Sequence, residues 1–305
     1  MTRSLTAFCS SLVVAWLVGC GAPAAESPAE EAPSAQPPAT APSEAASVSG
    51  ATPSGLHYDA RGAGDAVVLV HAFSLDRRMW DEQVEVLEDR YRVVRFDQRG
   101  HGRSGAPEQA YAAHTDLLEI FDALGLESAS LVGLSSGAEA SLDFAIAFPE
   151  RVDRLFLASP GLSGYVPEGS FDWMSGVMSA LQAGDAEEAM RRWVETPLMR
   201  VADAGANARI AEIGNSNWRL WTYSPELRRM FDPPAVGRLD EVDAPTLVIV
   251  GALDLADTLR VGELLTAGIE GAEKITIEDA GHMVNLAAPG VFNEAMHGFL
   301  AEEGG

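Results

Sequence analysis

The feature that most constrains this chain is a Gly-x-Ser-x-Gly motif centred on Ser135. The apolar run 129–134 leads into it and predicts a buried strand, whereas the spacing over residues 136–148 predicts a helix. A serine between a strand end and a helix start lies on a sharp turn that exposes its hydroxyl. The flanking glycines allow strand and helix to approach closely. Ser135 is therefore our candidate nucleophile.

Other short apolar runs alternate with segments of helical spacing. Strands are expected at 56–59, 66–70, 92–96, 154–158, 246–250 and 274–277, and helices at 79–87 and 112–124. Continuous apolar strands separated by helices predict an α/β fold, with a mostly parallel central sheet and helices on both faces. Ligands bind such sheets at the carboxyl ends of the strands, where Ser135 is expected to lie.

A serine nucleophile needs a base and an acid that orients the base. His282 follows the last predicted strand, on a loop that returns over the edge of the sheet, and is our candidate base. Asp254 follows the strand 246–250 and is our candidate orienting carboxylate. Two alternatives remain open at this point: Asp257, one turn further on, takes this role, or Asp254 only caps the following helix.

Acyl transfer also needs hydrogen-bond donors for the oxyanion that forms on the substrate. The backbone N–H of Ser136 lies at the start of the predicted helix, where the helix dipole favours negative charge. The loop after strand 66–70 passes beside it, which makes the N–H of Phe73 the second candidate donor.

The other five histidines are expected to have structural or surface positions. His71 and His101 lie in loops and are interpreted as bracing them. His57 and His297 are expected at the surface, and His114, at the start of a helix, is expected in solvent.

The first residues read as an export signal. Residues 1–19 combine Arg3 with a short apolar run, and Leu17-Val18-Gly19-Cys20 resembles the lipobox of a bacterial lipoprotein signal. We expect lipidation at Cys20 and an exported, membrane-anchored protein of the bacterial cell envelope. The alternatives are an ordinary signal peptide or a short anchor.

Residues 20–54 are rich in Pro, Ala, Ser and Glu, and predict a disordered linker between the lipid and a folded domain at 55–305. The net charge of −24 argues against nucleic acid as a partner. The only cysteines are Cys9 and Cys20, so no disulfide and no cysteine-based metal site is expected in the folded domain. No metal and no cofactor is expected.

A long segment at about 161–243 interrupts the alternation of strands and helices. It holds four of the six tryptophans, which are Trp173, Trp193, Trp218 and Trp221. We interpret it as a helical cap, whose apolar residues partly pack its underside and partly line a pocket. Such a pocket favours an acyl or aromatic ester, or a lactone, over a highly charged substrate.

Taken together, the motifs give residues 55–305 a resemblance to the α/β-hydrolase family. The matching runs are His71-x-Phe73, Asp97-x-Arg99-Gly100-His101-Gly102-x-Ser104, the motif at Ser135, Gly251-x-x-Asp254 and Gly281-His282. The order Ser135, Asp254, His282 is that of the family's catalytic triad. The chain looks most like the β-ketoadipate enol-lactone hydrolases and related esterases. It departs from them at Ala72, where glycine is usual, and at Ser136, where methionine is frequent.

The resemblance implies an enzyme, a serine hydrolase that cleaves small-molecule carboxylic esters or lactones through an acyl-enzyme. Enol-lactone hydrolysis itself is not expected, because it belongs to cytoplasmic catabolism and this chain carries an export signal. Two alternatives remain: hydrolysis of peptide or carbon–carbon bonds by the same triad, or a catalytically silent binding protein with this fold.

Overall fold

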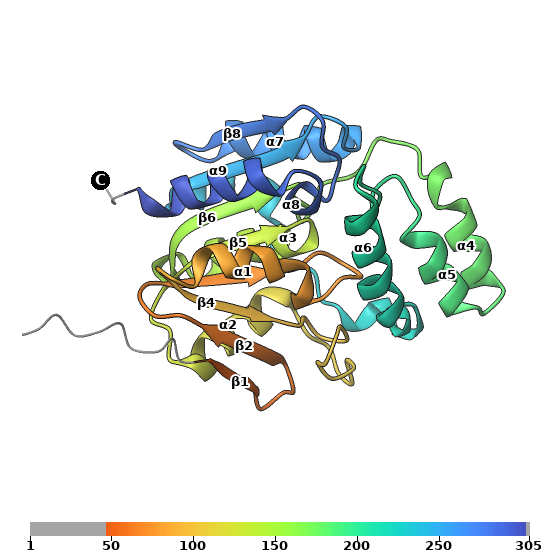
Figure 1. Cartoon of the computed structure of the whole chain (residues 1–305), viewed down its shortest axis with the longest axis horizontal. Coiled ribbons are helices and arrows are strands. Elements are labelled where there is room, and N and C mark those ends of the chain that lie inside the picture. The colour runs from red at the N-terminus through yellow and green to blue at the C-terminus, as the bar shows by residue number, and fades with distance from the viewer. Residues whose placement is uncertain (1–46, 303–305) are drawn as a thin grey trace, which may run out of the picture. The chain divides into compact units, whose positions relative to one another are not determined.

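A computed structural model describes residues 47–302 of the chain. Eight strands form one sheet. They are β1 (Val48–Ala51), β2 (His57–Arg61), β3 (Ala66–Val70), β4 (Arg92–Phe96), β5 (Ala129–Leu134), β6 (Val152–Ala158), β7 (Thr246–Gly251) and β8 (Glu273–Ile277). The order across the sheet is β1-β2-β4-β3-β5-β6-β7-β8 (Figure 1). Strand β2 is antiparallel to both of its neighbours, β1 and β4, and every pair from β4 to β8 is parallel.

Helices cover both faces of this sheet (Figure 1). They are α1 (Asp81–Leu87), α2 (Ala113–Leu124), α3 (Ser136–Ala147), α7 (Ala256–Gly268), α8 (Val284–Ala287) and α9 (Pro289–Ala301). Side chains of α1 and α9 share one buried cluster, in which Trp80 and Phe156 both pack against Phe292. Those of α2, α3 and α7 share the other, with Phe121 against Phe144. The expected α/β fold with a mostly parallel sheet is therefore confirmed.

The segment between β6 and β7, which we call the cap, carries three further α-helices. They are α4 (Ser175–Gln182), α5 (Ala186–Trp193) and α6 (Ala204–Ser216). Figure 1 shows these helices grouped together beyond one end of the strands, apart from the helices that cover the sheet. Short 3₁₀ helices join α6 to β7. These helices fall within the limits expected for the cap.

The expected linker extends too far toward the folded domain. Strand β1 lies inside residues 20–54, and pairs with β2 in the register Val48↔Ala60 to Ala51↔His57. Its side chains are mostly exposed, so backbone hydrogen bonds hold it in the sheet. Composition could not reveal such a strand, because it contributes almost nothing to the apolar core.

The predicted signal peptide, Cys20 and most of the predicted linker lie outside the described residues. Within residues 47–302, no helix has the length and apolar character that a membrane span requires.

Candidate active site

Ser135 occupies the turn between β5 and α3. Its backbone is left-handed, with φ 57° and ψ −115°, a conformation that costs a non-glycine residue about 1–3 kcal/mol. Its N–H donates to the carbonyl oxygen of Ala158, at 2.9 Å, which fixes the turn against β6. A Cβ at Gly137 would overlap the backbone oxygens of Val70 and His71, so only glycine lets α3 approach β3 this closely. The turn therefore presents the Ser135 side chain at the carboxyl edge of the sheet.

Asp254 and His282 form a hydrogen-bonded pair at the same edge. His282 Nδ1 lies 2.8 Å and 3.0 Å from the two carboxylate oxygens of Asp254, whose side chain is fully buried. Facing a carboxylate, Nδ1 carries the proton, and Nε2 is left as an acceptor. That Nε2 is buried and has no hydrogen-bond partner among residues 47–302.

The loops that carry this pair are joined through their backbones. Asp254 follows β7 and His282 follows β8, and the N–H of Leu253 donates to the carbonyl of Ala280 at 2.9 Å. A Cβ at Gly251 would overlap the oxygens of Ala280 and Gly281, so a larger residue would push the two loops apart. Because β5 to β8 are parallel, all three candidate catalytic residues lie at one edge. No hydrogen bond joins Ser135 to His282 in the part of the chain that the structure describes.

The competing carboxylate, Asp257, has other partners. It accepts hydrogen bonds from the hydroxyl of Tyr165 at 2.9 Å and from the N–H groups of Glu168 and Gly169 at 2.9 and 3.0 Å. The Glu168 N–H, together with these other donors, lowers the pKa of Asp257. Asp257 thus anchors the first part of the cap, while Asp254 contacts His282.

The two candidate oxyanion donors, Phe73 and Ser136, line one cavity. Neither backbone N–H donates a hydrogen bond to another of the described residues. Ser136 opens α3, where the first N–H groups of a helix have no intrahelical acceptor. Both N–H groups therefore have no acceptor among the described residues. Ser135, Asp254 and His282 are not among the residues that line the cavity, which adjoins Ser135 through its neighbour Ser136.

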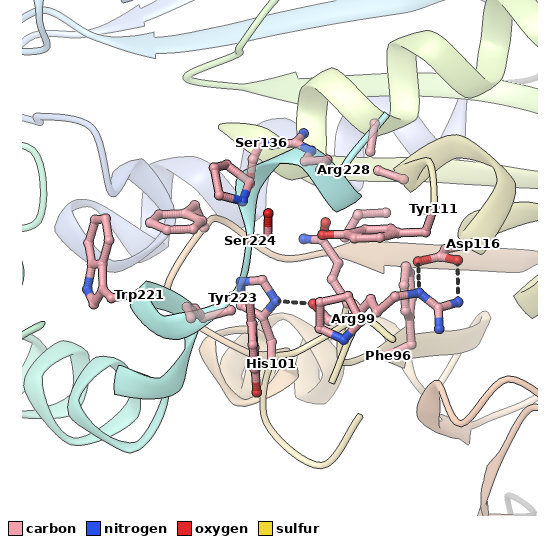
Figure 2. Close-up of a pocket in the computed structure, with 18 residues that line it drawn as sticks. Phe96, Arg99, His101, Tyr111, Asp116, Ser136, Trp221, Tyr223, Ser224 and Arg228 are labelled. Atoms are coloured by element: carbon pink, nitrogen blue, oxygen red, sulfur yellow. Dashed lines mark hydrogen bonds and ion pairs between the residues drawn. The ribbon is translucent and has the colours of Figure 1, made fainter. Parts of the chain in front are cut away.

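The cavity has a volume of about 410 Å³ and is bordered by both the sheet and the cap (Figure 2). Its walls are mainly aromatic and apolar. The aromatic members are Phe73, Phe96, Tyr111, Trp221 and Tyr223. Of the four cap tryptophans, only Trp221 lines it, and the sequence offered no local signal for Tyr111 or Tyr223, which come from separate segments.

The two arginines that line the cavity have carboxylate partners. Arg99 binds Asp116 through two hydrogen bonds of 2.6 and 3.0 Å, which Figure 2 shows as dashed lines, and Arg228 lies 2.8 Å from Glu139. Burial raises the pKa of Asp116 although Arg99 lowers it. These pairs offset the positive charges that would otherwise face a ligand.

His71 and His101 brace loops, as expected. His71 Nδ1 lies 2.8 Å from the carbonyl of Ala72, and its Nε2 accepts the N–H of Gln98 at 2.8 Å. His101 Nδ1 lies 3.0 Å from the carbonyl of Arg99. Burial lowers the pKa of His71, and lowers the pKa of His101 to about 3, so both rings are neutral near pH 7.

Two expectations for the remaining histidines are wrong. His57, in β2, is buried. His114 is half-buried, with its ring 4.9 Å from that of Phe231 in an edge-on contact. Phe231 comes from a distant segment of the chain, so the sequence around His114 could not indicate this contact.

Fold and site geometry together define a hydrolase of the α/β type, and comparison with known proteins agrees. The model of the "Alpha/beta hydrolase family" matches residues 67–295, so the chain belongs to that family. It is 27% identical over 240 residues to 3-oxoadipate enol-lactonase 1 of Acinetobacter baylyi, covering 77% of this chain and 88% of the relative.

Two solved structures are also similar. The enol-lactonase of Burkholderia xenovorans LB400 has a TM-score of 0.68 at 27% identity, over 84% of this chain and 100% of that protein. A hydrolase of Pseudomonas aeruginosa has a TM-score of 0.68 at 29% identity, over 84% of this chain and 98% of that protein.

Proposed function

We propose that the protein is a serine hydrolase that cleaves carboxylic esters or lactones, with Ser135, His282 and Asp254 as its catalytic triad. The observation that carries the proposal is the Asp254–His282 pair, at the sheet edge where Ser135 is held in a left-handed turn. The similarity to an enol-lactonase supports ester or lactone chemistry.

In this mechanism the Ser135 hydroxyl attacks the carbonyl carbon and its proton passes to His282 Nε2. The carbonyl oxygen becomes an oxyanion, which accepts hydrogen bonds from the N–H groups of Phe73 and Ser136. His282 then returns the proton to the leaving alcohol, and an acyl-enzyme remains. Water attacks this ester by the same steps, which releases the acid and regenerates Ser135. Asp254 keeps the Nδ1 proton in place and stabilises the imidazolium.

The cavity favours an uncharged group on the substrate. Its aromatic walls bury apolar surface, and its arginines are already paired with Asp116 and Glu139. A free carboxylate on the substrate would be desolvated there and would have to compete with those partners. Neutral acyl or aryl esters and neutral lactones are therefore the proposed substrates.

A fluorophosphonate probe tests the chemistry, and a panel of p-nitrophenyl esters tests the substrate class. The probe is expected to label Ser135, as identified by peptide mass spectrometry. Butyrate and phenylacetate esters are expected to have a higher kcat/KM than the hemisuccinate, which carries a free carboxylate. Labelling of a different residue contradicts the triad, and preference for the hemisuccinate contradicts the role given to the cavity.

The location of the enzyme is a separate proposal. We propose that it is an exported lipoprotein anchored through Cys20, on the basis of the lipobox-like run at 17–20. The acidic domain would be repelled by anionic head groups, so the lipid and the linker would make the attachment.

A further inference from the structure

Ser74, directly after the candidate oxyanion donor Phe73, is held in an unfavourable backbone conformation. Its φ of 68° is left-handed, and it is one of only three non-glycine residues with positive φ among the described residues. Its side chain is fully buried. A left-handed backbone raises the conformational free energy of a serine by about 1–3 kcal/mol, so this conformation persists only where the surrounding structure holds it.

Both side-chain hydrogen bonds to Ser74 come from the cap. The indole Nε1 of Trp193, at the end of α5, donates to Ser74 Oγ at 2.7 Å. The side-chain Nδ2 of Asn217, directly after α6, donates to the Ser74 carbonyl oxygen at 3.2 Å. Both partners are more than 100 residues away along the chain, and both bonds are buried.

Asn217 also joins this loop to a second one. Its Oδ1 accepts the N–H of Gly102 at 2.7 Å, and its Nδ2 lies 3.2 Å from the carboxylate of Asp76. The loop after β3 and the glycine-rich loop after β4 are thus held against the end of α6 by one buried side chain.

The ring of Phe73 is in contact with the same part of the cap. Its centroid lies 5.7 Å from that of Trp193 and 5.5 Å from that of Trp221, both nearly perpendicular. The residues just before Phe73 are held from outside the cap: His71 Nδ1 lies 2.8 Å from the Ala72 carbonyl oxygen, and Gln98 Nε2 donates to the His71 carbonyl oxygen at 2.5 Å. The cap therefore holds Phe73 and Ser74 themselves, while the contacts of His71 hold the residues before them.

We propose that Trp193 and Asn217 are positioning residues, which hold the N–H of Phe73 in place for the oxyanion. The oxyanion hole is then complete only when the cap is docked on the loop after β3. This inference rests on the proposed function, since the Phe73 N–H matters to catalysis only if an oxyanion forms beside it.

The test uses Trp193→Phe in the full-length protein, which removes the indole N–H and keeps an aromatic ring. A misplaced oxyanion donor stabilises the transition state less and leaves substrate binding unchanged. We therefore expect kcat to fall about tenfold or more, and KM to change by less than about threefold. Loss of a whole donor costs about 10²–10³ in kcat, which sets the upper limit. The affinity for a trifluoromethyl ketone, which forms an oxyanion on Ser135, should fall in parallel with kcat/KM.

Trp173→Phe is the matched control. Trp173 lies in the same aromatic group, 6.0 Å from Trp193, but neither lines the cavity nor binds the loop. Its replacement should leave kcat and the ketone affinity within about twofold. Ser74→Ala removes the acceptor of the same hydrogen bond and keeps the proposal testable if Trp193→Phe does not fold. The double variant should lose no more activity than either single one, because both remove one interaction.

Two results overturn the proposal. One is a kcat and a ketone affinity for Trp193→Phe equal to those of Trp173→Phe. The other is a raised KM with unchanged kcat, which would make Trp193 a wall of the substrate site. Failure of the proposed function is distinguishable, because the fluorophosphonate would then not label Ser135 even in the unaltered protein.

Discussion

At the scale of single residues, Ser135 carries the proposed chemistry through its hydroxyl, and Ser136 through its backbone. Ser135→Ala should therefore reduce kcat for a p-nitrophenyl ester by about 10⁴-fold or more. Ser136→Ala keeps the backbone N–H and should cost far less. Steady-state kinetics with circular dichroism as a folding check measures both. Comparable losses in the two variants would contradict the division of roles.

Asp254 and Asp257 differ in their contacts, which predicts different effects of the same substitution. Asp254→Asn should reduce kcat by about 10³–10⁴-fold, because an amide at this position favours the wrong tautomer of His282. Asp257→Asn disturbs only the hydrogen bonds that anchor the first part of the cap, so kcat should fall by less than about tenfold. Measurement of kcat for both variants at one pH tests which aspartate orients His282. A reversed order would mean that Asp254 is not the orienting acid.

At the scale of elements, the two ends of the cap meet at helix α3. The Ser163 hydroxyl donates to the carboxylate of Asp143, at 2.7 Å, and accepts the N–H of Ala235 at 2.9 Å. Burial raises the pKa of Asp143 to about 7, with Glu139 also raising it, while Ser163 and the nearby arginines lower it. A buried carboxyl group thus joins the first and last segments of the cap to α3.

This raised pKa predicts how stability depends on pH. A carboxyl group whose pKa is higher in the folded state stabilises that state at low pH, and this contribution is lost as pH rises from about 4 through about 7. Asp143→Asn resembles the protonated acid, so its free energy of unfolding should match wild type near pH 4. At pH 8 it should exceed wild type by an amount on the order of a few kcal/mol. Urea unfolding of both proteins at pH 4, 6 and 8 measures this difference. Parallel pH dependences would show that Asp143 does not titrate in this range.

At the scale of the whole molecule, the proposed lipid anchor would keep an acidic enzyme at a membrane. Cys20→Ser should abolish acylation and either block processing or, if another peptidase cleaves the chain, release soluble enzyme with unchanged kinetics. Cys9→Ser is the matched control, because Cys9 lies within the predicted signal and should not affect acylation. Mass spectrometry of the mature N-terminus and membrane fractionation follow both variants. An unmodified N-terminus beyond Cys20 would indicate ordinary secretion.

The sequence by itself determined the fold and nominated the candidate catalytic residues. Runs such as 66–70 and 247–250 are apolar throughout because parallel strands are covered on both faces, so they can be located without a structure. Ser135 directly follows such a run, and Asp254 and His282 lie in the loops after β7 and β8; parallel strands bring these ends to one edge. A local pattern was sufficient for these residues, because the direction of a strand and the residue at which it ends determine where the following loop lies.

Only the tertiary structure decided which of these residues touch and what surrounds them. It placed His282 beside Asp254, Asp257 beside the first part of the cap, and β1 in the sheet despite its exposed side chains. It also assembled the cavity and brought Trp193 to Ser74, 119 residues apart in sequence. No local sequence pattern indicates these contacts. Hydrogen bonds and packing between distant segments depend on the folded arrangement and not on the periodicity of either segment.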